Sequence, residues 1–370
     1  MAKTKLHELA EHGQSPWIDY LSRPFLQEGD LAGLVDEGIQ GVTSNPTIFQ
    51  GAIAEGDAYD EQLRELIAGG ESEPKEIFIA LASQDIRAAC DELRRVYDDG
   101  GGRDGWVSFE VDPNLAHETE ATIEEARRLH ALIDRPNLFI KIPATPEGLP
   151  AIEETIAAGI PVNVTLIFSL ERHRKVAEAY VRGVERFVKG GGDPSGKLAS
   201  VASFFVSRVD TEADRRLDEI GGHDELKGKL AIANAKLAYV TYQEVFSGPD
   251  WDELANRGAT AQRCLWASTS TKNDAYKDTI YVEELVGPET VNTMPRELVE
   301  AVLDHGEIRG NTIEEDLDGA RKVFDDLKAA GVDYDDVSET LEREGVEKFA
   351  KSFKELFSDV ESKRDELVAA

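Results

Sequence analysis

A single lysine interrupts an otherwise apolar run in the first half of the chain. Lys141 lies between Ile140 and Ile142, and a proline-containing turn follows it. Burying an ammonium group without a partner costs free energy, and a buried lysine reduces that cost by losing its proton. A neutral amine in a dry pocket is the nucleophile that forms Schiff bases with carbonyl compounds. By itself, the pattern also fits an edge-strand lysine whose stem leads to water.

Polar side chains also interrupt or end the other apolar segments of the chain. These residues are Asp19, Asn45, Glu110, Asn163, Thr165, Ser203 and Arg208. Each has a structural explanation when taken alone: Asp19 can cap a turn, Asn45 can hold the turn before the next proline, and Glu110 can pair with an arginine. The remaining four can satisfy backbone groups, fill a small space or begin a helix. Because all of them accompany a lysine in an apolar strand, we expect one shared site.

Short strands separated by helices are the elements that position these residues. Apolar runs predict eight strands, at 15–21, 39–43, 106–111, 137–142, 161–168, 198–205, 263–268 and 290–294. Apolar residues at helical spacing predict intervening helices such as 26–37 and 74–97. This alternation predicts a closed parallel (β/α)8 TIM barrel, whose active site lies at the carboxyl ends of its strands. A doubly wound open sheet is the alternative, but no strand precedes the glycine fingerprint of a dinucleotide site.

We expect one α/β domain over residues 1–370, because no linker and no internal repeat divides the chain. The barrel core is predicted over about 15–305, with an additional helix before it and a helical extension over about 306–370. Alternate residues of a strand face opposite sides. Ile140 and Ile142 should therefore point toward the helices, and the partners of Lys141 should come from neighbouring strands, Glu110 and Thr165 first.

The charge balance argues against several classes of partner. The net charge is −32, from 73 acidic and 41 basic side chains. Such a surface repels nucleic acid and anionic membranes, so we expect neither as a partner. The acidic residues are spread along the chain, which is typical of solvated helix faces and also compatible with adaptation to a salty medium. A phosphorylated substrate would need local basic groups to overcome the surrounding field.

Cysteine and histidine usage indicates neither a disulfide framework nor a metal site. The chain has two cysteines, Cys90 and Cys264, which fits a reducing compartment. His7 and His12 are five residues apart, a spacing that turns them onto different faces of a helix, so we expect no metal ligands. With no signal peptide and no run long enough to span a membrane, the sequence predicts a cytoplasmic protein.

Five ordered motifs resemble those of the transaldolase family, in its longer bacterial branch. They are 41–47 (GVTSNPT), 107–112 (VSFEVD), 140–145 (IKIPAT), 163–169 (NVTLIFS) and 202–210 (ASFFVSRVD). The resemblance extends from about Trp17 to the C-terminal helices. It implies an enzyme without metal or organic cofactor, which transfers a dihydroxyacetone unit from a ketose phosphate to an aldose phosphate through a lysine Schiff base. It leaves the oligomeric state open between monomer and homodimer.

The resemblance also implies roles for the polar strand ends. Lys141 matches the Schiff-base lysine, and Glu110 and Thr165 match the pair that holds a water for proton transfer. Asp19 matches the acid/base for carbon–carbon cleavage. Four other positions match substrate-binding residues: Asn45 and Asn163 for the three-carbon fragment, and Ser203 and Arg208 for the donor and its phosphate.

One segment departs from the family pattern. Where better-known members carry a second phosphate-binding arginine after the seventh strand, this chain has Ser270 and Lys272, which we expect to replace it. Two rival functions remain: an aldolase that releases free dihydroxyacetone, and a catalytically silent barrel that binds sugar phosphates. The silent barrel is disfavoured because Lys141, Glu110 and Asp19 are all retained.

Overall fold

Eight parallel strands in sequential order form a closed barrel in the computed structural model, which describes residues 3–54, 56–196 and 198–369. The strands are β1 (Gln14–Asp19), β2 (Gly41–Thr43), β3 (Trp106–Glu110), β4 (Leu138–Pro143), β5 (Val162–Ile167), β6 (Ser200–Phe205), β7 (Arg263–Ala267) and β8 (Thr290–Met294). Pairing of β1 with β8 closes the barrel. Every strand overlaps its predicted range, and the predicted (β/α)8 TIM barrel is confirmed.

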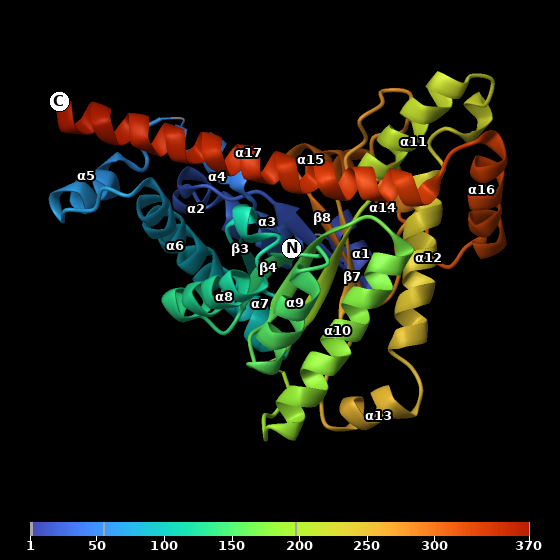
Figure 1. The fold of residues 1–370 in the computed structure, drawn as a ribbon, viewed down its shortest axis with the longest axis horizontal. Helices are drawn as coiled ribbons and strands as arrows, with labels where there is room; N and C mark the ends of the chain where they lie inside the picture. Colours follow the sequence, from blue (N-terminus) through green and yellow to red (C-terminus); the bar gives the residue numbers. More distant parts are fainter. Residues whose placement is uncertain (1–2, 55, 197, 370) are drawn as a thin grey trace.

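Helices surround the barrel (Figure 1). They are α1 (Lys5–Glu11), α2 (Arg23–Gln27), α3 (Asp30–Glu37), α4 (Pro46–Ala54), α5 (Asp60–Ala68), α6 (Pro74–Glu92), α7 (Arg94–Asp99), α8 (Thr119–Ile133), α9 (Gly148–Ala157), α10 (Leu170–Lys189), α11 (Ser207–Ile220), α12 (Leu230–Val245), α13 (Pro249–Asn256), α14 (Ile280–Glu283), α15 (Arg296–His305), α16 (Leu317–Ala330) and α17 (Tyr334–Ala369), with single 3₁₀ turns at Pro113–Leu115 and Asp224–Leu226. Within the described parts of the chain, we find no helix with the length and apolar character needed to cross a membrane.

Two predicted helices are each divided in the structure. The range 26–37 covers the end of α2 and all of α3, because Gly29 between them has φ +83° and interrupts the helical backbone. The range 74–97 covers α6 and most of α7, which meet at Leu93, and α7 continues to Asp99. The helix α4 has no strong sequence signal, since its first residue, Pro46, suits a strand break and a first helical turn equally well.

Aromatic rings fill the amino end of the barrel. Trp106 stacks on Phe139 with ring centroids 4.2 Å apart, and Trp17 lies 6.2 Å from the same ring. Beside them the buried Arg263 guanidinium donates to Asp104 at 2.8 Å. Ring packing and a satisfied ion pair thus stabilise the amino end of the barrel. In barrels of this type the active site lies at the carboxyl end.

The long helix α17 crosses the barrel at its carboxyl end and continues past α4 and α5 (Figure 1). Gly345 permits the close approach, because a Cβ at this position would lie only 3.0 Å from the Leu166 side chain at the end of β5. The side chain of Thr47 in α4 donates a hydrogen bond to Ser352 in α17. The last helix is therefore packed directly against the mouth of the barrel.

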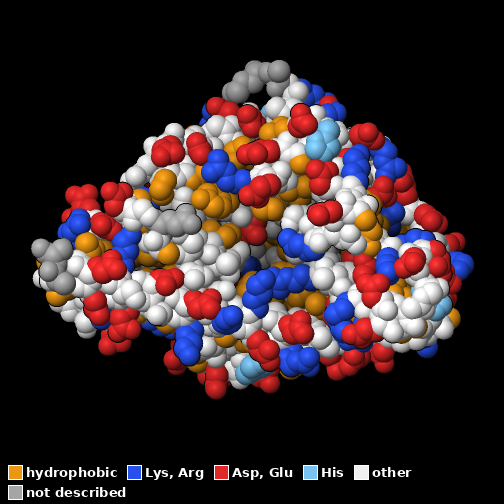
Figure 2. Space-filling model, turned by 90° about the horizontal axis from the view of Figure 1, so that it is seen from above, with side chains coloured by type: hydrophobic (Ala, Val, Ile, Leu, Met, Phe, Trp, Pro, Cys, Tyr) orange, Lys and Arg blue, Asp and Glu red, His pale blue; other side chains and the backbone are white. Residues whose placement is uncertain are grey.

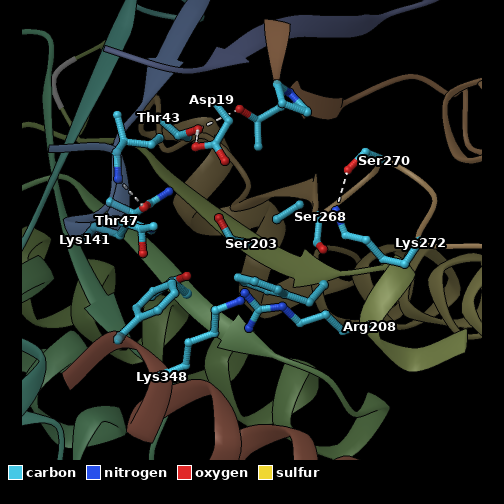
Figure 3. Close-up of a pocket in the computed structure, with 18 residues that line it drawn as sticks. Asp19, Thr43, Thr47, Lys141, Ser203, Arg208, Ser268, Ser270, Lys272 and Lys348 are labelled. Carbon is cyan, nitrogen blue, oxygen red and sulfur yellow. Dashed lines mark hydrogen bonds between the residues drawn. The ribbon is translucent and has the colours of Figure 1, made fainter. Parts of the chain in front are cut away.

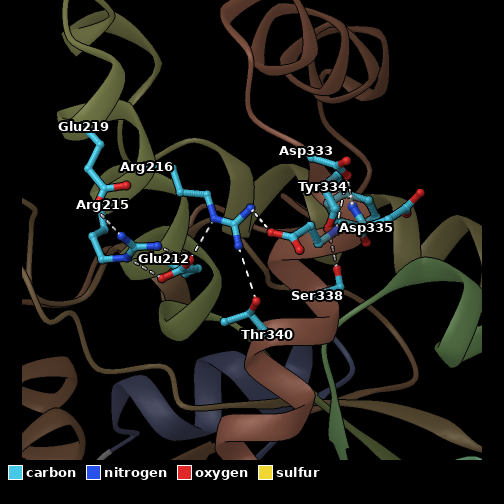
Figure 4. Close-up of polar contacts among 10 residues, drawn as sticks. Glu212, Arg215, Arg216, Glu219, Asp333, Tyr334, Asp335, Ser338 and Thr340 are labelled. Atoms are coloured by element: carbon cyan, nitrogen blue, oxygen red, sulfur yellow. Dashed lines mark hydrogen bonds and ion pairs between the residues drawn. The ribbon is translucent and has the colours of Figure 1, made fainter.

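Polar contacts hold α17 on both sides of the mouth. Toward its beginning, Arg216 of α11 lies between Glu212 of its own helix and Thr340 of α17 (Figure 4), and it also pairs with Asp336 at 2.6 Å. Toward its end, Lys363 pairs with Asp60 of α5 at 3.0 Å. These contacts fix the register of the helix along the barrel mouth.

Candidate active site

A pocket of about 380 Å³ opens at the carboxyl end of the barrel (Figure 3). Its lining comes from strand ends, the loops after them and α17: Asp19, Thr43, Asn45, Thr47, Ile48, Lys141, Thr165, Ser203, Phe205, Arg208, Ala267, Ser268, Ser270, Lys272, Thr293, Pro295, Lys348 and Phe349. Eight of the ten residues predicted for the site line this pocket. The other two, Glu110 and Asn163, lie beneath its floor and contact residues that line it.

Lys141 and Glu110 form a buried ion pair in the floor of the pocket. The two residues are directly paired across β3 and β4, and the Lys141 Nζ donates to the Glu110 Oε2 at 3.0 Å and to the Ser44 carbonyl at 3.3 Å. Their exposed fractions are 5% and 6%. Glu110 was expected on a neighbouring strand as one of the first partners of Lys141, and this is confirmed.

Burial changes the acidity of both carboxyl groups of the site. Removal from water raises the pKa of Glu110, and the nearby Lys141 charge opposes this rise. Burial likewise raises the pKa of Asp19, opposed by the Lys141 charge and by the hydrogen bond that Thr43 donates to Asp19 at 2.7 Å. A carboxyl group with a raised pKa accepts and returns a proton near neutral pH more readily than an exposed one.

A chain of hydrogen bonds fixes the side chains on β5 and β6. The Ser203 hydroxyl donates to the Asn163 Oδ1 at 2.7 Å, and the Asn163 Nδ2 donates to the Ser108 hydroxyl at 3.0 Å. Asn163 is fully buried, and its contact with Ser203 joins the floor to the wall of the pocket.

Thr165 differs from its neighbours because its buried hydroxyl has no hydrogen-bond partner within the described protein. The next residue, Leu166, has φ +61°, a left-handed conformation that is unusual for a branched side chain. The pairing register of β5 with β6 shifts at the same place. An unpaired buried hydroxyl and a strained backbone at a pocket wall are features that structures tolerate at functional sites.

Asn45 has a structural contact as well as a place in the pocket wall. Its Oδ1 accepts a hydrogen bond from the Ile48 backbone at 3.1 Å, which caps the beginning of α4. Its side chain also forms a hydrogen bond with Asp19 that lowers the pKa of this carboxyl group, so Asn45 joins the acid of the pocket to the beginning of α4.

The opposite wall of the pocket is basic. The Arg208 guanidinium lies 5.0 Å from the Phe205 ring, and burial lowers the pKa of Arg208. The Lys272 Nζ donates to the Ser270 hydroxyl at 2.9 Å. In a space-filling view, basic side chains gather beside the hollow of this face while acidic ones dominate the periphery (Figure 2). This wall is suited to an anionic group.

Sequence patterns did not indicate two residues that α17 brings to the pocket, Lys348 and Phe349. The Phe349 ring lies 5.5 Å from the Lys141 Nζ. A lysine and a phenylalanine on an amphipathic helix are ordinary, so only the position of the helix reveals them. As for metals, no cluster of three or more histidine, cysteine or acidic side chains that could hold an ion occurs among the residues described.

The fold and the pocket define the class of this protein. A closed (β/α)8 barrel with an aromatic base and a polar pocket at the carboxyl ends of its strands has the architecture of the barrel enzymes. Comparison with known sequences then gives the family. The family model described as Transaldolase/Fructose-6-phosphate aldolase matches residues 16–360, and the chain belongs to this family.

Similar proteins extend over almost the whole chain. A protein named Transaldolase from Frankia alni is 56% identical over 358 residues, covering 96% of both chains. One from Acidothermus cellulolyticus is 57% identical over 357 residues, covering 96% of this chain and 95% of its own. One from Mycobacterium tuberculosis is 51% identical over 364 residues, with 97% of each chain covered. The resemblance found in the five motifs is confirmed.

Proposed function

We propose that this protein is a transaldolase that moves a dihydroxyacetone unit between phosphorylated sugars through a Schiff base on Lys141. The donor is a ketose phosphate such as fructose 6-phosphate or sedoheptulose 7-phosphate. The acceptor is an aldose phosphate, glyceraldehyde 3-phosphate or erythrose 4-phosphate. The observation that carries the proposal is the buried pair of Lys141 and Glu110 at 3.0 Å in the floor of a pocket with a basic wall.

The Lys141–Glu110 pair supplies the nucleophile. Transfer of a proton from the Lys141 ammonium to the Glu110 carboxylate, 3.0 Å away, leaves a neutral amine and a neutral acid. The amine then attacks the ketone carbon of the donor, and the carbinolamine loses water to give an iminium. Glu110 provides the proton for the departing water, and the Thr165 hydroxyl, which has no partner among the described residues, positions that water.

Asp19 is placed to act in the next step. The iminium withdraws electrons while the bond between carbons 3 and 4 breaks, and Asp19 takes the proton from the hydroxyl on carbon 4. The bonding electrons remain on the dihydroxyacetone fragment as an enamine, and the aldose phosphate leaves. The enamine then attacks the aldehyde carbon of the acceptor, Asp19 returns its proton to the new alkoxide, and water releases the product from Lys141.

The remaining predicted residues bind the substrate. Asn45 and Ser203, the latter held by Asn163, contact the three-carbon fragment near Lys141. Arg208, Ser270 and Lys272 attract the phosphate at the basic wall. Charge-assisted bonds to a phosphate are about twice as strong as neutral ones, so this wall orients the donor.

The acceptor dependence of the reaction tests the proposal against an aldolase function. Fructose 6-phosphate and erythrose 4-phosphate together should give sedoheptulose 7-phosphate and glyceraldehyde 3-phosphate. Without erythrose 4-phosphate, the rate should fall by about 10²-fold or more, which corresponds to a difference of ~3 kcal/mol in activation free energy. Equal rates with and without acceptor, together with free dihydroxyacetone as a product, would identify an aldolase.

We further propose that residues 1–370 form a single domain that works in the cytoplasm as a monomer or homodimer. The contacts of α17 with α4 and α5 support the single domain, because they join the extension over 306–370 to the barrel. Two buried free cysteines, Cys90 and Cys264, support a reducing compartment.

A further inference from the structure

Lys348 reaches the pocket from the last helix of the chain rather than from a barrel strand or loop. It directly precedes Phe349, whose ring lies over the Lys141 amine. Its side chain extends from α17 toward the guanidinium of Arg208 (Figure 3). The helix is held on both sides of the mouth, by Arg216 with Asp336 and by Lys363 with Asp60, so the position of Lys348 is fixed by the fold.

Three basic side chains from three different elements meet at this wall. Arg208 belongs to α11, Lys272 follows β7 and Lys348 belongs to α17. The charge of Arg208 lowers the pKa of Lys348, with burial and the charge of Lys272 as smaller causes. Lys348 is therefore close enough to both Arg208 and Lys272 to be repelled by their charges.

No carboxylate of the described residues forms an ion pair with any of these three cations. The nearest acidic influence is Asp19, which interacts with Arg208 across the pocket without direct contact. This is unusual in a chain of net charge −32, where most basic side chains have an acidic neighbour. Unpaired cations that converge on a cavity carry a cost that a bound anion removes.

We propose that Lys348 is a third cationic ligand of the substrate phosphate and, with Arg208 and Lys272, selects phosphorylated sugars over unphosphorylated ones. This inference rests on the proposed function and adds a residue to it. The arginine offers a planar pair of donors, and the two lysines add point charges from other sides of a phosphate. Lys141 takes the carbonyl end of the same sugar, so the wall and the floor define the two ends of the substrate.

Binding of inorganic phosphate tests the inference without any need for catalysis. Calorimetric titration should show that Lys348→Met weakens phosphate binding by about 10-fold or more, the loss expected for one charge-assisted hydrogen bond. Lys348→Arg should restore most of the affinity because it retains the charge. The matched control is Lys354→Met, the same change at an exposed position of α17, which should bind phosphate as the unaltered protein does.

Steady-state kinetics provide the second readout. For Lys348→Met, KM for fructose 6-phosphate should rise by about 10-fold, and the preference for fructose 6-phosphate over fructose should fall by a similar factor. Phosphate affinity and sugar preference equal to those of Lys354→Met would overturn the inference. If Lys348→Met does not fold, Lys348→Gln, which keeps a polar chain of similar length, gives the same comparison.

The two readouts separate this inference from the proposed function. If the unaltered protein does not transfer dihydroxyacetone, but Lys348→Met binds phosphate more weakly than it does, the proposed function is wrong and the anion site stands. If the unaltered protein transfers dihydroxyacetone, but Lys348→Met binds phosphate as tightly as it does, the anion-site role of Lys348 is wrong and the transaldolase proposal stands.

Discussion

At the scale of single residues, two carboxyl groups accompany the lysine of the pocket. Glu110 lies 3.0 Å from the Lys141 amine, and Asp19 lies at the same pocket with a pKa that burial raises. The two carboxyl groups have different partners, a lysine for one and a threonine hydroxyl for the other. Different environments allow the two carboxyl groups to hold different protonation states during one reaction.

The unpaired hydroxyl of Thr165 leads to a prediction in which stability and activity respond differently. Thr165→Val keeps the shape of the side chain and removes a buried hydroxyl for which the described part of the chain offers no partner. The free energy of unfolding in urea should therefore stay within about 1 kcal/mol of the original value or rise. The kcat for dihydroxyacetone transfer should fall by about 10²-fold. A loss of stability without loss of kcat would assign the hydroxyl to packing.

Asp19→Asn should separate imine formation from carbon–carbon cleavage. The variant keeps Lys141 and Glu110, so borohydride with fructose 6-phosphate should still trap an adduct on the protein. Transfer to erythrose 4-phosphate should fall by about 10²- to 10⁴-fold, because the amide of the variant cannot take the proton from the hydroxyl on carbon 4. Failure to trap any adduct with the folded variant would place Asp19 in the first half of the reaction instead.

At the scale of elements, a buried carboxyl group joins the helices that support the basic wall. Asp210 of α11 accepts hydrogen bonds from the Ala231 backbone at the beginning of α12 and from the Tyr281 hydroxyl in α14, both at 2.7 Å. Burial raises the pKa of Asp210 to about 7, with a smaller contribution from Asp214. Arg208 lies two residues away on the same helix, so this contact positions part of the proposed phosphate site.

The raised pKa of Asp210 predicts a pH dependence of stability. Between pH about 4 and 7, Asp210 keeps a proton in the folded protein that it has released in the unfolded chain. This proton adds to the free energy of unfolding at the acidic end of the range, and the contribution is lost as the pH rises through about 7. From pH 5 to 8 the free energy of unfolding should fall by about 2 kcal/mol relative to that of Asp210→Asn. Urea titrations measure this difference.

Asp218→Asn, at an exposed position of the same helix, is the control for that comparison. Its stability should follow the unaltered protein across the pH range. If Asp210→Asn and Asp218→Asn depend on pH in the same way, Asp210 does not hold the proton that its burial implies.

Sequence patterns reached the strands and their polar ends but not the last helix. Eight apolar runs, most of them with polar residues near their carboxyl ends, suffice to locate Lys141 and Glu110 on neighbouring strands, because parallel strands pair in a regular register. The contribution of Lys348 depends on where α17 crosses the barrel, which long-range contacts such as Thr47 with Ser352 determine. The φ of Gly29 and of Leu166 are likewise set by tertiary packing, and no local pattern predicts them.

At the scale of the whole molecule, the chain has a net charge of −32, and its acidic surface surrounds a pocket with a basic wall. Self-repulsion of the acidic surface destabilises the compact state, and salt screens it over a Debye length of about 10 Å at 0.1 M and 3 Å at 1 M. Raising sodium chloride from 0.1 to 1 M should therefore increase the melting temperature by a few degrees. A melting temperature that falls would show that attractive surface pairs outweigh the repulsion.

The most direct measurement of the central claim is the trapping of a covalent adduct. The protein is incubated with fructose 6-phosphate and borohydride, and the labelled peptide is identified by mass spectrometry. Reduction of the iminium should leave a dihydroxyacetone-derived adduct on Lys141, and Lys141→Met should carry none and lose transfer activity by at least about 10³-fold. An adduct on another lysine, or normal transfer without any adduct, would contradict the account.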